Sequence, residues 1–570
     1  MMKKVVILFL ELIMYVTVCH AFDRQWDRYG WPEQKPPKEL IICKQTNQKA
    51  ESMLLESLSG LAAKAVNEGR FDKMVWIQTN NKSYERILDE SLDALKIQKV
   101  TYMDMWELLT YLKQQKIVKG YVLYELEGER KEKISSYSSN IATIYASLLS
   151  GVLIDSSLQE RAVMYGLKKL KDVRKESTAE CFKKNKQKLN NSSALSIHPS
   201  VSNMRDYAIA HSLMLYADEK EVIDDILAWV KPLSPILGWG CGDEFEFTKL
   251  ASEWGHFNTA SDWCINLPFI SAAAPYISLR KVKEIGLEEI NFSDTTYVHS
   301  FVMSDGDNMQ WTMGSFVDNL NYLGHSQATS EGINWTLCPS NLAVISPASW
   351  NAIVEKQGES SYIEYGGGYQ YPDLFAIKRE NRKELLRTFA KRVNRFLRET
   401  DIKIFGVICQ DVTSDRAQEA FQIYAEELTD ITGIIAIQYF PYELGKKVFW
   451  YSNKQGIQIP VVTATFSLWN EVSKQRSNCG TPEYISSLVN RDEKLAVGKE
   501  RYSWTIVHAW SDFSKTSKST LQNAIGVNPI LATRKLLDNN VRMVSMNELL
   551  WRIRMMYYPE EVKKLIFQGN

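Results

Sequence analysis

Carboxylates follow hydrophobic runs at several points in the second half of the chain. Asp305 and Asp307 flank Gly306 directly after the run 297–303, and Asp411 follows the run 403–409. Hydrolysis of a glycosidic bond normally uses two carboxyl groups, one to protonate the leaving oxygen and one to act as nucleophile or base. If these runs are parallel strands, their carboxyl ends meet at one edge of a sheet. Asp305, Asp307 and Asp411 are therefore candidate catalytic residues, and a loop in which Asp305 and Asp307 only bond backbone N–H groups is the structural alternative.

The segment Tyr362–Phe375 reads YIEYGGGYQYPDLF, and this mixture is unusual for a core strand or a surface helix. Its glycines allow backbone angles closed to other residues, and Pro372 fixes its own φ. The composition predicts a shaped loop whose tyrosine rings can stack on a sugar. A tight turn whose tyrosines pack inward fits the same composition. Asp373 is the candidate second acid, and Glu364 stays open as its alternative.

The heptad Gly366-Gly367-Gly368-Tyr369-Gln370-Tyr371-Pro372 resembles the signature of the GxGYxYP family, which is described as putative glycoside hydrolases. The likeness extends to residues 298–308 upstream and to Gln410-Asp411 downstream. It implies a carbohydrate-active hydrolase with its site near this loop. One departure is that relatives are expected to carry a small-residue run of the Gly-Pro-Ser type before the heptad, where this chain has residues 362–365.

Further residues that could bind a substrate follow other hydrophobic runs. His508 can bond a sugar hydroxyl or adjust the pKa of a carboxylate, although a histidine with a purely structural role fits equally. The predicted substrate-binding residues are Tyr369, Tyr371, Asn308, Gly368, Glu443, His508 and Trp510.

Residues 305–308 read Asp-Gly-Asp-Asn, whose oxygens could also hold a cation. We expect no cofactor, and a divalent cation such as calcium at Asp305 and Asp307 is the alternative, although the full EF-hand pattern is missing. The histidines show no HxxH, HxxxH or HExxH spacing, which argues against zinc. The sequence also contains no GxSxG nucleophile elbow, phosphate loop or dinucleotide motif.

The runs that precede these residues form a series from residue 295 onward, and helical stretches such as 382–398 and 416–428 separate several of them. This pattern predicts an α/β chain with a C-terminal (β/α) barrel, incomplete or distorted, of about seven strands. An open doubly wound sheet is the alternative. The predicted strands are 297–303, 335–338, 403–409, 434–438, 459–465, 503–507 and 542–545.

Small α/β units are predicted before the barrel, because strand-like runs alternate there with helical periodicity. The predicted domains are a signal peptide (1–21), an N-terminal α/β unit (22–115), a second α/β unit (116–200), a third unit (201–290) and the barrel-like catalytic domain (291–570). The predicted strands are 74–78, 118–126 and 236–240, and the predicted helices are 52–67, 84–95, 103–115, 204–215 and 220–231.

The N-terminus has the pattern of a secretory signal. Two lysines precede an apolar stretch from Val5 to Val18, and Cys19-His20-Ala21 follows, which predicts cleavage after Ala21. We expect an exported protein, either periplasmic or extracellular. Lipoprotein anchoring at Cys19 is disfavoured, because Val18 stands where a small residue is needed.

Composition limits the partners of the chain. The 68 basic side chains are balanced by 68 acidic ones, so nothing predicts binding to nucleic acid. The sequence contains no second long apolar run, so we expect no transmembrane span after signal removal. Seven cysteines without CxxC pairs remain, and one bridge between Cys241 and Cys264 stays open.

Together these observations predict an exported glycoside hydrolase that acts on an oligo- or polysaccharide with paired carboxylates. The alternative is a noncatalytic glycan-binding or surface-assembly protein. The sugar, the linkage and the stereochemical outcome are not fixed by the sequence.

Overall fold

The structure is a computed structural model that describes residues 28–128, 133–440, 442–470, 478–518 and 524–569. The chain forms two compact units. The N-terminal unit consists of Met1–Glu244, Ser261–Ser278 and Ala343–Ala348, and the C-terminal unit of Phe245–Ala260, Leu279–Leu342 and Ser349–Asn570. The signal peptide predicted for residues 1–21 lies outside the described residues. Its processing and the predicted domain limits stay predictions.

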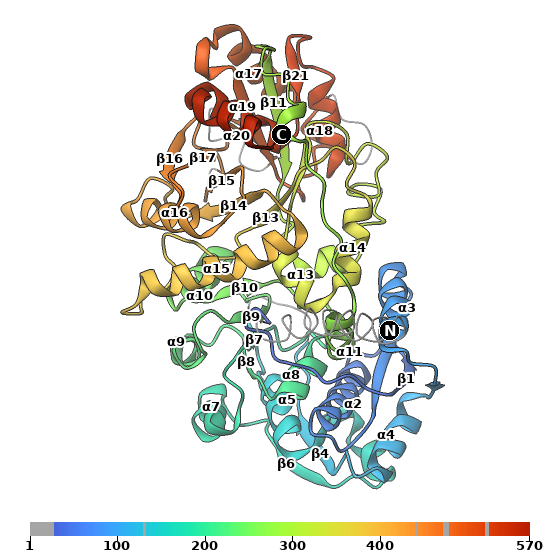
Figure 1. Cartoon of the computed structure of the whole chain (residues 1–570). Coiled ribbons are helices and arrows are strands. Elements are labelled where there is room, and N and C mark those ends of the chain that lie inside the picture. Colours follow the sequence, from blue (N-terminus) through green and yellow to red (C-terminus); the bar gives the residue numbers. More distant parts are fainter. Residues whose placement is uncertain (1–27, 129–132, 441, 471–477, 519–523, 570) are drawn as a thin grey trace, which may run out of the picture. The chain divides into compact units, whose positions relative to one another are not determined.

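Three small parallel sheets in the N-terminal unit share one topology (Figure 1). In each, the first strand pairs on its two sides with the next two strands, in the orders β2-β1-β3, β5-β4-β6 and β8-β7-β9, and the last of these is part of a four-stranded sheet in which β10 (Phe257–Thr259) follows β9. The strands are β1 (Glu39–Lys44), β2 (Lys73–Gln78), β3 (Val100–Tyr102), β4 (Gly120–Tyr124), β5 (Gly151–Asp155), β6 (Lys169–Asp172), β7 (Ala194–Ser196), β8 (Met214–Tyr216) and β9 (Pro235–Gly238).

Helices connect the strands of each sheet, so each module is a βαβαβ unit. After the first strand come α2 (Lys49–Asn67), α5 (Ser138–Leu149) and α8 (Arg205–His211), and after the second come α3 (Lys82–Leu95), α6 (Gln159–Met164) and α9 (Lys220–Trp229). The remaining helices of this unit are α4 (Met105–Gln114), α7 (Thr178–Asn185) and α11 (Leu267–Ala273).

The helices α2, α5 and α8 pack against one another in the middle of the N-terminal unit. Their residues are buried along most of their length, as expected of helices that are apolar on several faces. Gly60 of α2 permits the close approach, because a Cβ there would lie 2.6 Å from the carbonyl oxygen of Asp206 on α8. The core of this unit is therefore shared by all three modules.

Arg205 stabilises this helix cluster through hydrogen bonds. Its buried guanidinium donates to Ser139 O at 2.9 Å, Thr143 Oγ1 at 2.6 Å and Asn140 Oδ1 at 3.1 Å. A buried charge needs such partners to offset the loss of water. Burial lowers the pKa of Arg205 to about 10, so the side chain stays charged at neutral pH.

An eleven-stranded sheet forms the C-terminal unit, in the order β16-β17-β15-β14-β13-β12-β11-β20-β18-β19, with β21 also paired to β11. All pairs are parallel except β16 with β17. The strands are β11 (Tyr297–Met303), β12 (Ile333–Leu337), β13 (Tyr362–Tyr365), β14 (Ile404–Cys409), β15 (Gly433–Gln438), β16 (Val448–Ser452), β17 (Gln458–Thr463), β18 (Phe466–Leu468), β19 (Cys479–Gly480), β20 (Tyr502–Val507) and β21 (Val541–Met543).

Helices pack on the strands of this sheet, among them α16 on β16, α17 on β18 and α19 on β11 and β17. The C-terminal unit also contains the short strand β10 (Phe257–Thr259). Its helices are α10 (Glu244–Glu253), α12 (Met309–Met313), α13 (Pro339–Ile345), α14 (Pro347–Glu355), α15 (Arg382–Thr400), α16 (Asp415–Glu427), α17 (Pro482–Leu495), α18 (Val527–Arg534), α19 (Met546–Tyr557) and α20 (Pro559–Gly569). Helices α10, α13 and α14 each include residues that belong to the N-terminal unit.

The pairing order of the sheet returns on itself. β17 pairs with β15, while β18 pairs with β20 at the other end of the order, and only Ala464 and Thr465 separate β17 from β18. The structure therefore confirms a mixed α/β fold with many parallel strands, here in a curled half-barrel sheet. The count of seven barrel strands stays a prediction.

Several local predictions are corrected. The predicted helix 204–215 ends at His211, because Ser212 takes a left-handed conformation (φ 55°) and residues 214–216 form β8. Residues 362–365, predicted as loop, form β13 between β12 and β14. Cys241 and Cys264 are both free thiols, so the bridge left open between them is absent.

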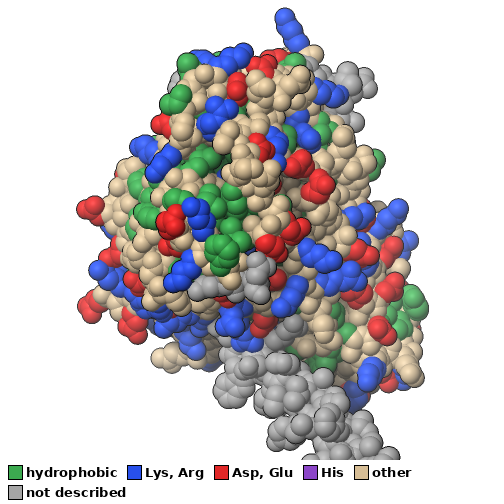
Figure 2. All heavy atoms as spheres, turned by 45° about the horizontal axis from the view of Figure 1, so that its top comes forward, with side chains coloured by type: hydrophobic (Ala, Val, Ile, Leu, Met, Phe, Trp, Pro, Cys, Tyr) green, Lys and Arg blue, Asp and Glu red, His purple; other side chains and the backbone are tan. Residues whose placement is uncertain are grey.

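Acidic and basic side chains are interspersed on the face drawn in Figure 2, as the balanced composition predicts. Within the described residues, no helix is both long and apolar enough to cross a membrane.

Candidate active site

The turn after β11 brings two carboxylates to the carboxyl edge of the sheet. Gly306 lies so close to β12 that a Cβ there would be 1.5 Å from the carbonyl oxygen of Thr336, and its N–H donates to Thr336 Oγ1 at 3.1 Å. Asp305 takes a left-handed conformation with φ 66°, which is rare outside glycine. Its Oδ2 atom accepts from the Ser304 hydroxyl and, at 3.4 Å, from the N–H of Ala509.

Asp307 is buried, with 9% of its surface exposed, and lies near Tyr365 at the end of β13. Burial and, after it, the charges of Asp307 and Asp305 raise the pKa of Tyr365 well above its ordinary value. The hydroxyl of Tyr365 therefore stays protonated beside both carboxylates. Asn308 has a structural contact, because its Oδ1 atom accepts from the N–H of Trp311 at 3.3 Å and caps α12.

The glycines of the signature segment adopt the conformations that the sequence predicts. Gly366, Gly367 and Gly368 have φ angles of 71°, 71° and 124°. At Gly368 a Cβ would lie 2.4 Å from the ring of Phe257, so the backbone approaches β10 closely. Tyr369 and Asn258 exchange backbone hydrogen bonds at 2.8 and 2.9 Å in an isolated antiparallel bridge.

The tyrosines of this segment pack inward. Tyr369 is 7% exposed and Tyr371 is fully buried, with its ring 5.4 Å from Phe245 and 5.5 Å from Tyr439 between centroids. The structure thus favours the tight turn with inward tyrosines over a loop that presents both rings to solvent. The segment therefore packs inside the protein next to the carboxyl edge of the sheet, and these two rings are not surface groups.

Glu364 is a buried carboxyl group of β13. Its Oε2 atom accepts from the N–H of Ser340 at 2.8 Å and from the Ser340 hydroxyl at 2.6 Å. Burial raises its pKa to about 7, although hydrogen bonds from Ser340 and the backbone of Gly367 oppose the shift. Glu364 therefore joins the start of α13 to the glycine turn inside the protein.

The carboxylate of Asp373 contacts the backbone around Asp411, and the two carboxylates differ in exposure. Buried Asp373 accepts from the N–H groups of Gln410 at 3.2 Å and Asp411 at 2.9 Å, and burial raises its pKa. Asp411 is exposed, and its Oδ1 atom accepts from the N–H of Thr413 at 2.8 Å and the Thr413 hydroxyl at 2.7 Å. These contacts shape the turn after β14.

Aromatic rings form a three-ring stack and a second cluster beside the Asp305 turn. The ring of Trp469 lies parallel to His508, with centroids 3.6 Å apart, and to Tyr442 on its other side, with centroids 3.9 Å apart. Trp510 is 41% exposed and contacts Trp311 at a centroid distance of 4.6 Å. Since Ala509 lies between His508 and Trp510, its contact with Asp305 places the carboxylate next to this stack.

The sequence indicates His508, Trp510 and Trp469 near the carboxyl ends of the strands, but it does not assign roles to Tyr442 or Tyr365. For Tyr365 the signal that could have found it is position, because it ends β13. Glu443 is buried, and its Oε2 atom accepts from the N–H of Gly445 at 3.2 Å and from Asn478 Nδ2 at 3.4 Å. It holds the loop that carries Tyr442.

Within the described residues, no group of three or more His, Cys, Asp or Glu side chains converges as a metal site. At the Asp305 turn, Asp305 Oδ2 and Asn308 Oδ1 already accept hydrogen bonds from the protein. The expectation of no cofactor, and a calcium ion at Asp305 and Asp307 as its alternative, both stay predictions.

Two family descriptions match the sequence. Residues 294–528 match the "GxGYxYP putative glycoside hydrolase C-terminal domain", and residues 191–272 match the "GxGYxYP third domain". No curated protein matches the chain.

The fold is similar to that of a solved structure from Bacteroides thetaiotaomicron, described as a putative hydrolase. The TM-score is 0.74 at 20% identity, and the match covers 92% of this chain and 96% of that one. A domain of unknown function from Bordetella bronchiseptica with bound citrate aligns with a TM-score of 0.12 at 10% identity, over 75% of this chain and 94% of that one, and this carries no argument. The first similarity shows the fold alone. The signature heptad and the two matched regions together identify the chain as a member of the GxGYxYP family.

Proposed function

We propose that this chain is an exported glycoside hydrolase that acts on an oligo- or polysaccharide, with Asp305 and Asp307 as its paired carboxylates. The observation that carries the proposal is their position. Both carboxylates follow β11 at the carboxyl edge of a parallel sheet, and Asp305 contacts Ala509 between His508 and exposed Trp510. Glycosidic hydrolysis needs two acids beside a surface that holds a sugar ring.

Aromatic rings supply that surface in the proposal. A pyranose presents C–H groups that pack on an aromatic face, and exposed Trp510 offers such a face. Tyr365, whose hydroxyl stays protonated, can donate a hydrogen bond to an ionised carboxylate or to a sugar oxygen. One of Asp305 and Asp307 then acts as the general acid, and the other acts as the base or nucleophile.

Asp373 and Asp411 receive structural roles in this proposal. The carboxylate of Asp373 is bonded to two N–H groups of the turn after β14, and Asp411 closes a local turn with Thr413. The proposed site therefore depends on one pair of acids from a single turn.

The proposal is tested by product release from a panel of polysaccharides and aryl glycosides. We expect Asp305→Asn and Asp307→Asn each to lower turnover about a hundredfold or more, because a proton transfer or nucleophile is lost. Asp411→Asn is the matched control, since it makes the same change in an exposed turn, and turnover should persist. If folded Asp305→Asn and Asp307→Asn keep full turnover while Asp411→Asn loses it, the catalytic acids would have to be assigned to the turn after β14.

We also propose that the reaction uses no resident metal. Turnover should be unchanged after dialysis against EDTA, because one side-chain oxygen of Asp305 and one of Asn308 already accept hydrogen bonds within the protein. A loss of turnover that calcium restores would assign a cation to Asp305 and Asp307.

Glycan binding without turnover is the second candidate, and exposed Trp510 favours it specifically, because an open aromatic face can bind a sugar without any acid. In that case glycans bind but the panel yields no product, and Asp305→Asn leaves their affinity unchanged. A surface-assembly role belongs to the same outcome.

A further inference from the structure

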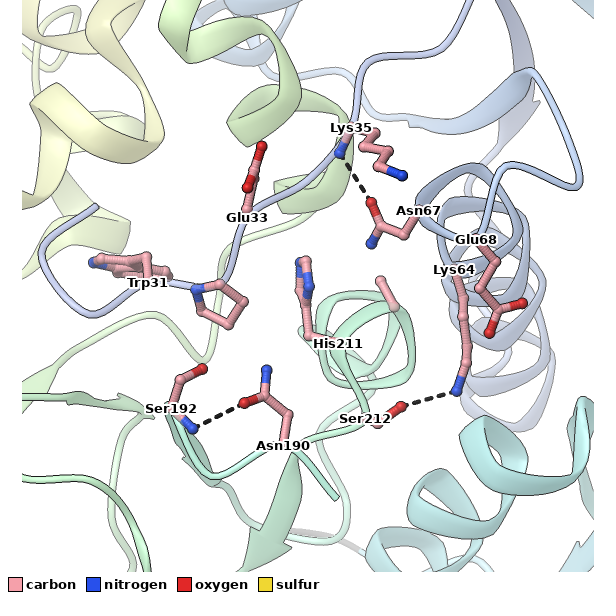
Figure 3. A pocket seen from close by; sticks show the side chains of 12 residues that line it. Trp31, Glu33, Lys35, Lys64, Asn67, Glu68, Asn190, Ser192, His211 and Ser212 are labelled. Carbon is pink, nitrogen blue, oxygen red and sulfur yellow. Dashed lines mark hydrogen bonds between the residues drawn. The ribbon is translucent and has the colours of Figure 1, made fainter. Parts of the chain in front are cut away.

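A cavity in the N-terminal unit lies where α2 and α8 end (Figure 3). Its volume is about 580 Å³, and its lining comes from the segment 31–35, the last turns of α2 and α8, and residues 190–192. Pockets that hold small molecules have volumes of roughly 300–1,000 Å³. All of its lining residues belong to the N-terminal unit, so it is distinct from the proposed active site.

The floor of this cavity carries a polar side chain that the protein does not satisfy. His211 is 8% exposed and projects from α8 among the labelled side chains of Figure 3. Within the described part of the chain, neither His211 Nε2 nor Ser192 Oγ has a hydrogen-bond partner. Buried polar atoms are nearly always paired, so two such atoms at one cavity point to an external partner.

The two floor side chains with unpaired atoms, His211 and Ser192, carry no charge of their own at physiological pH. Burial, followed by the charges of Arg28 and Lys64, lowers the pKa of His211 to about 3, so the imidazole is neutral at physiological pH. Lys64 has already used its three N–H groups, which donate to Ser147 O, Ser147 Oγ and Ser212 Oγ at 2.8 Å each. The floor therefore offers neutral donors and acceptors beside an ammonium group whose hydrogen bonds are made within the protein.

The remaining walls suit an uncharged molecule with both polar and apolar faces. Trp31, Pro32 and Ala210 provide apolar surface. The charges at the rim balance, since exposed Lys35 accompanies exposed Glu33 and Glu68, and Glu68 pairs with Arg70. A sugar ring combines an apolar C–H face with hydroxyls that both donate and accept, which matches this lining.

We propose that this cavity binds a single neutral sugar unit through His211, Asn190 and Ser192. The site is noncatalytic, because no carboxylate lies on its floor. The inference does not rest on hydrolysis, since its residues and its unit differ from those of the proposed active site.

Binding is tested with the full chain by titration calorimetry, with D-glucose, D-galactose and N-acetyl-D-glucosamine as neutral probes and D-glucuronate and D-glucosamine as charged counterparts. We expect a neutral probe to bind, and His211→Phe to weaken it about tenfold or more through the loss of one or two hydrogen bonds. Phenylalanine keeps an aromatic ring beside Tyr207, whose ring centroid is 4.3 Å from that of His211. Asn190→Ala, at a half-buried loop position, repeats the test if His211→Phe does not fold.

Two matched variants locate the binding. Glu68→Gln changes only the rim and should leave the affinity unchanged. Trp510→Ala, which alters the proposed substrate edge, should leave binding by the cavity intact. The proposal is overturned if no neutral probe binds, if a charged probe binds more tightly, or if binding survives both His211→Phe and Asn190→Ala but is lost in Trp510→Ala.

Discussion

At the scale of single residues, backbone geometry decides where the acids lie. Gly306 has no room for a side chain against Thr336, and Asp305 beside it holds a left-handed conformation. Strain of this kind is often found at functional sites. The need for glycine at 366–368 could be predicted from the sequence, because three successive glycines rarely serve another purpose. The φ angle of Asp305 could not, because the contact with β12 that imposes it is distant in sequence.

Gly306→Ala tests this geometry. The added Cβ would meet the Thr336 carbonyl at 1.5 Å, so the turn that carries Asp305 and Asp307 must move. We expect a destabilisation of about 3 kcal/mol or more, seen as a lower unfolding temperature, together with loss of turnover. Gly128→Ala is the control, since nothing lies within 4 Å of a Cβ there. A variant as stable and active as wild type would contradict the described turn.

Trp510→Ala tests the aromatic surface at the proposed active site. Because the ring is 41% exposed, its removal should cost little stability while the substrate loses a stacking partner. We expect KM to rise about tenfold with a smaller change in kcat, measured on the best substrate of the panel. Phe567→Ala, which removes an 80% exposed ring elsewhere, should leave KM unchanged. Equal effects of the two variants would exclude a specific role for Trp510.

At the scale of elements, seven of the eleven strands of the C-terminal sheet were predicted, and β13, β16, β18 and β19 were not. Residues 297–303 match β11 in full, because a short run rich in apolar residues is typical of a buried parallel strand, although His299 and Ser300 interrupt this one. Residues 362–365 contain a glutamate and two tyrosines, which seldom indicate a central strand. Only the folded neighbours, Ser340 and Gly367, give Glu364 the hydrogen bonds that permit its burial.

Glu364→Gln tests the role of this strand through pH. The folded-state pKa of about 7 lies above the ordinary value, so the stabilisation from the protonated form is present at low pH and is lost as pH rises through 7. Glutamine stays neutral. Relative to wild type, the variant should gain up to about 3 kcal/mol of stability as pH rises from about 4.5 to about 7, and the difference should stay constant above that range. Calorimetric unfolding of both proteins checks this, and a pH-independent difference would contradict a buried, protonated Glu364.

At the scale of the whole molecule, the sequence predicted small α/β units before a larger sheet but not their common topology. The strand β8 was missed because Ser212, which ends α8, takes a left-handed conformation although it is not glycine. The strand β7 was missed because it has only three residues. Sheet order is set by which strands pair, and pairing depends on contacts such as Gly60 with Asp206 that join distant segments. Periodicity in a single chain does not record such contacts.

Export is the whole-molecule prediction that follows from residues 1–21. We expect expression in a secreting host to yield a mature chain that begins at Phe22, as N-terminal sequencing or intact mass would show. Replacing the apolar run 5–18 with polar residues should leave the full-length chain inside the cell. A lipid-modified Cys19 at the N-terminus would instead establish the lipoprotein alternative.

The two-residue link between β17 and β18 has a consequence for the dynamics of the sheet. Because one continuous segment pairs with β15 on one side and with β20 on the other, neither end of the pairing order can open without loosening the other. Amide hydrogens of β17 and β18 should therefore exchange with solvent deuterium at similar rates and through one shared opening event. Ala464 and Thr465 are thus the covalent link that couples the opening of the two ends of the sheet.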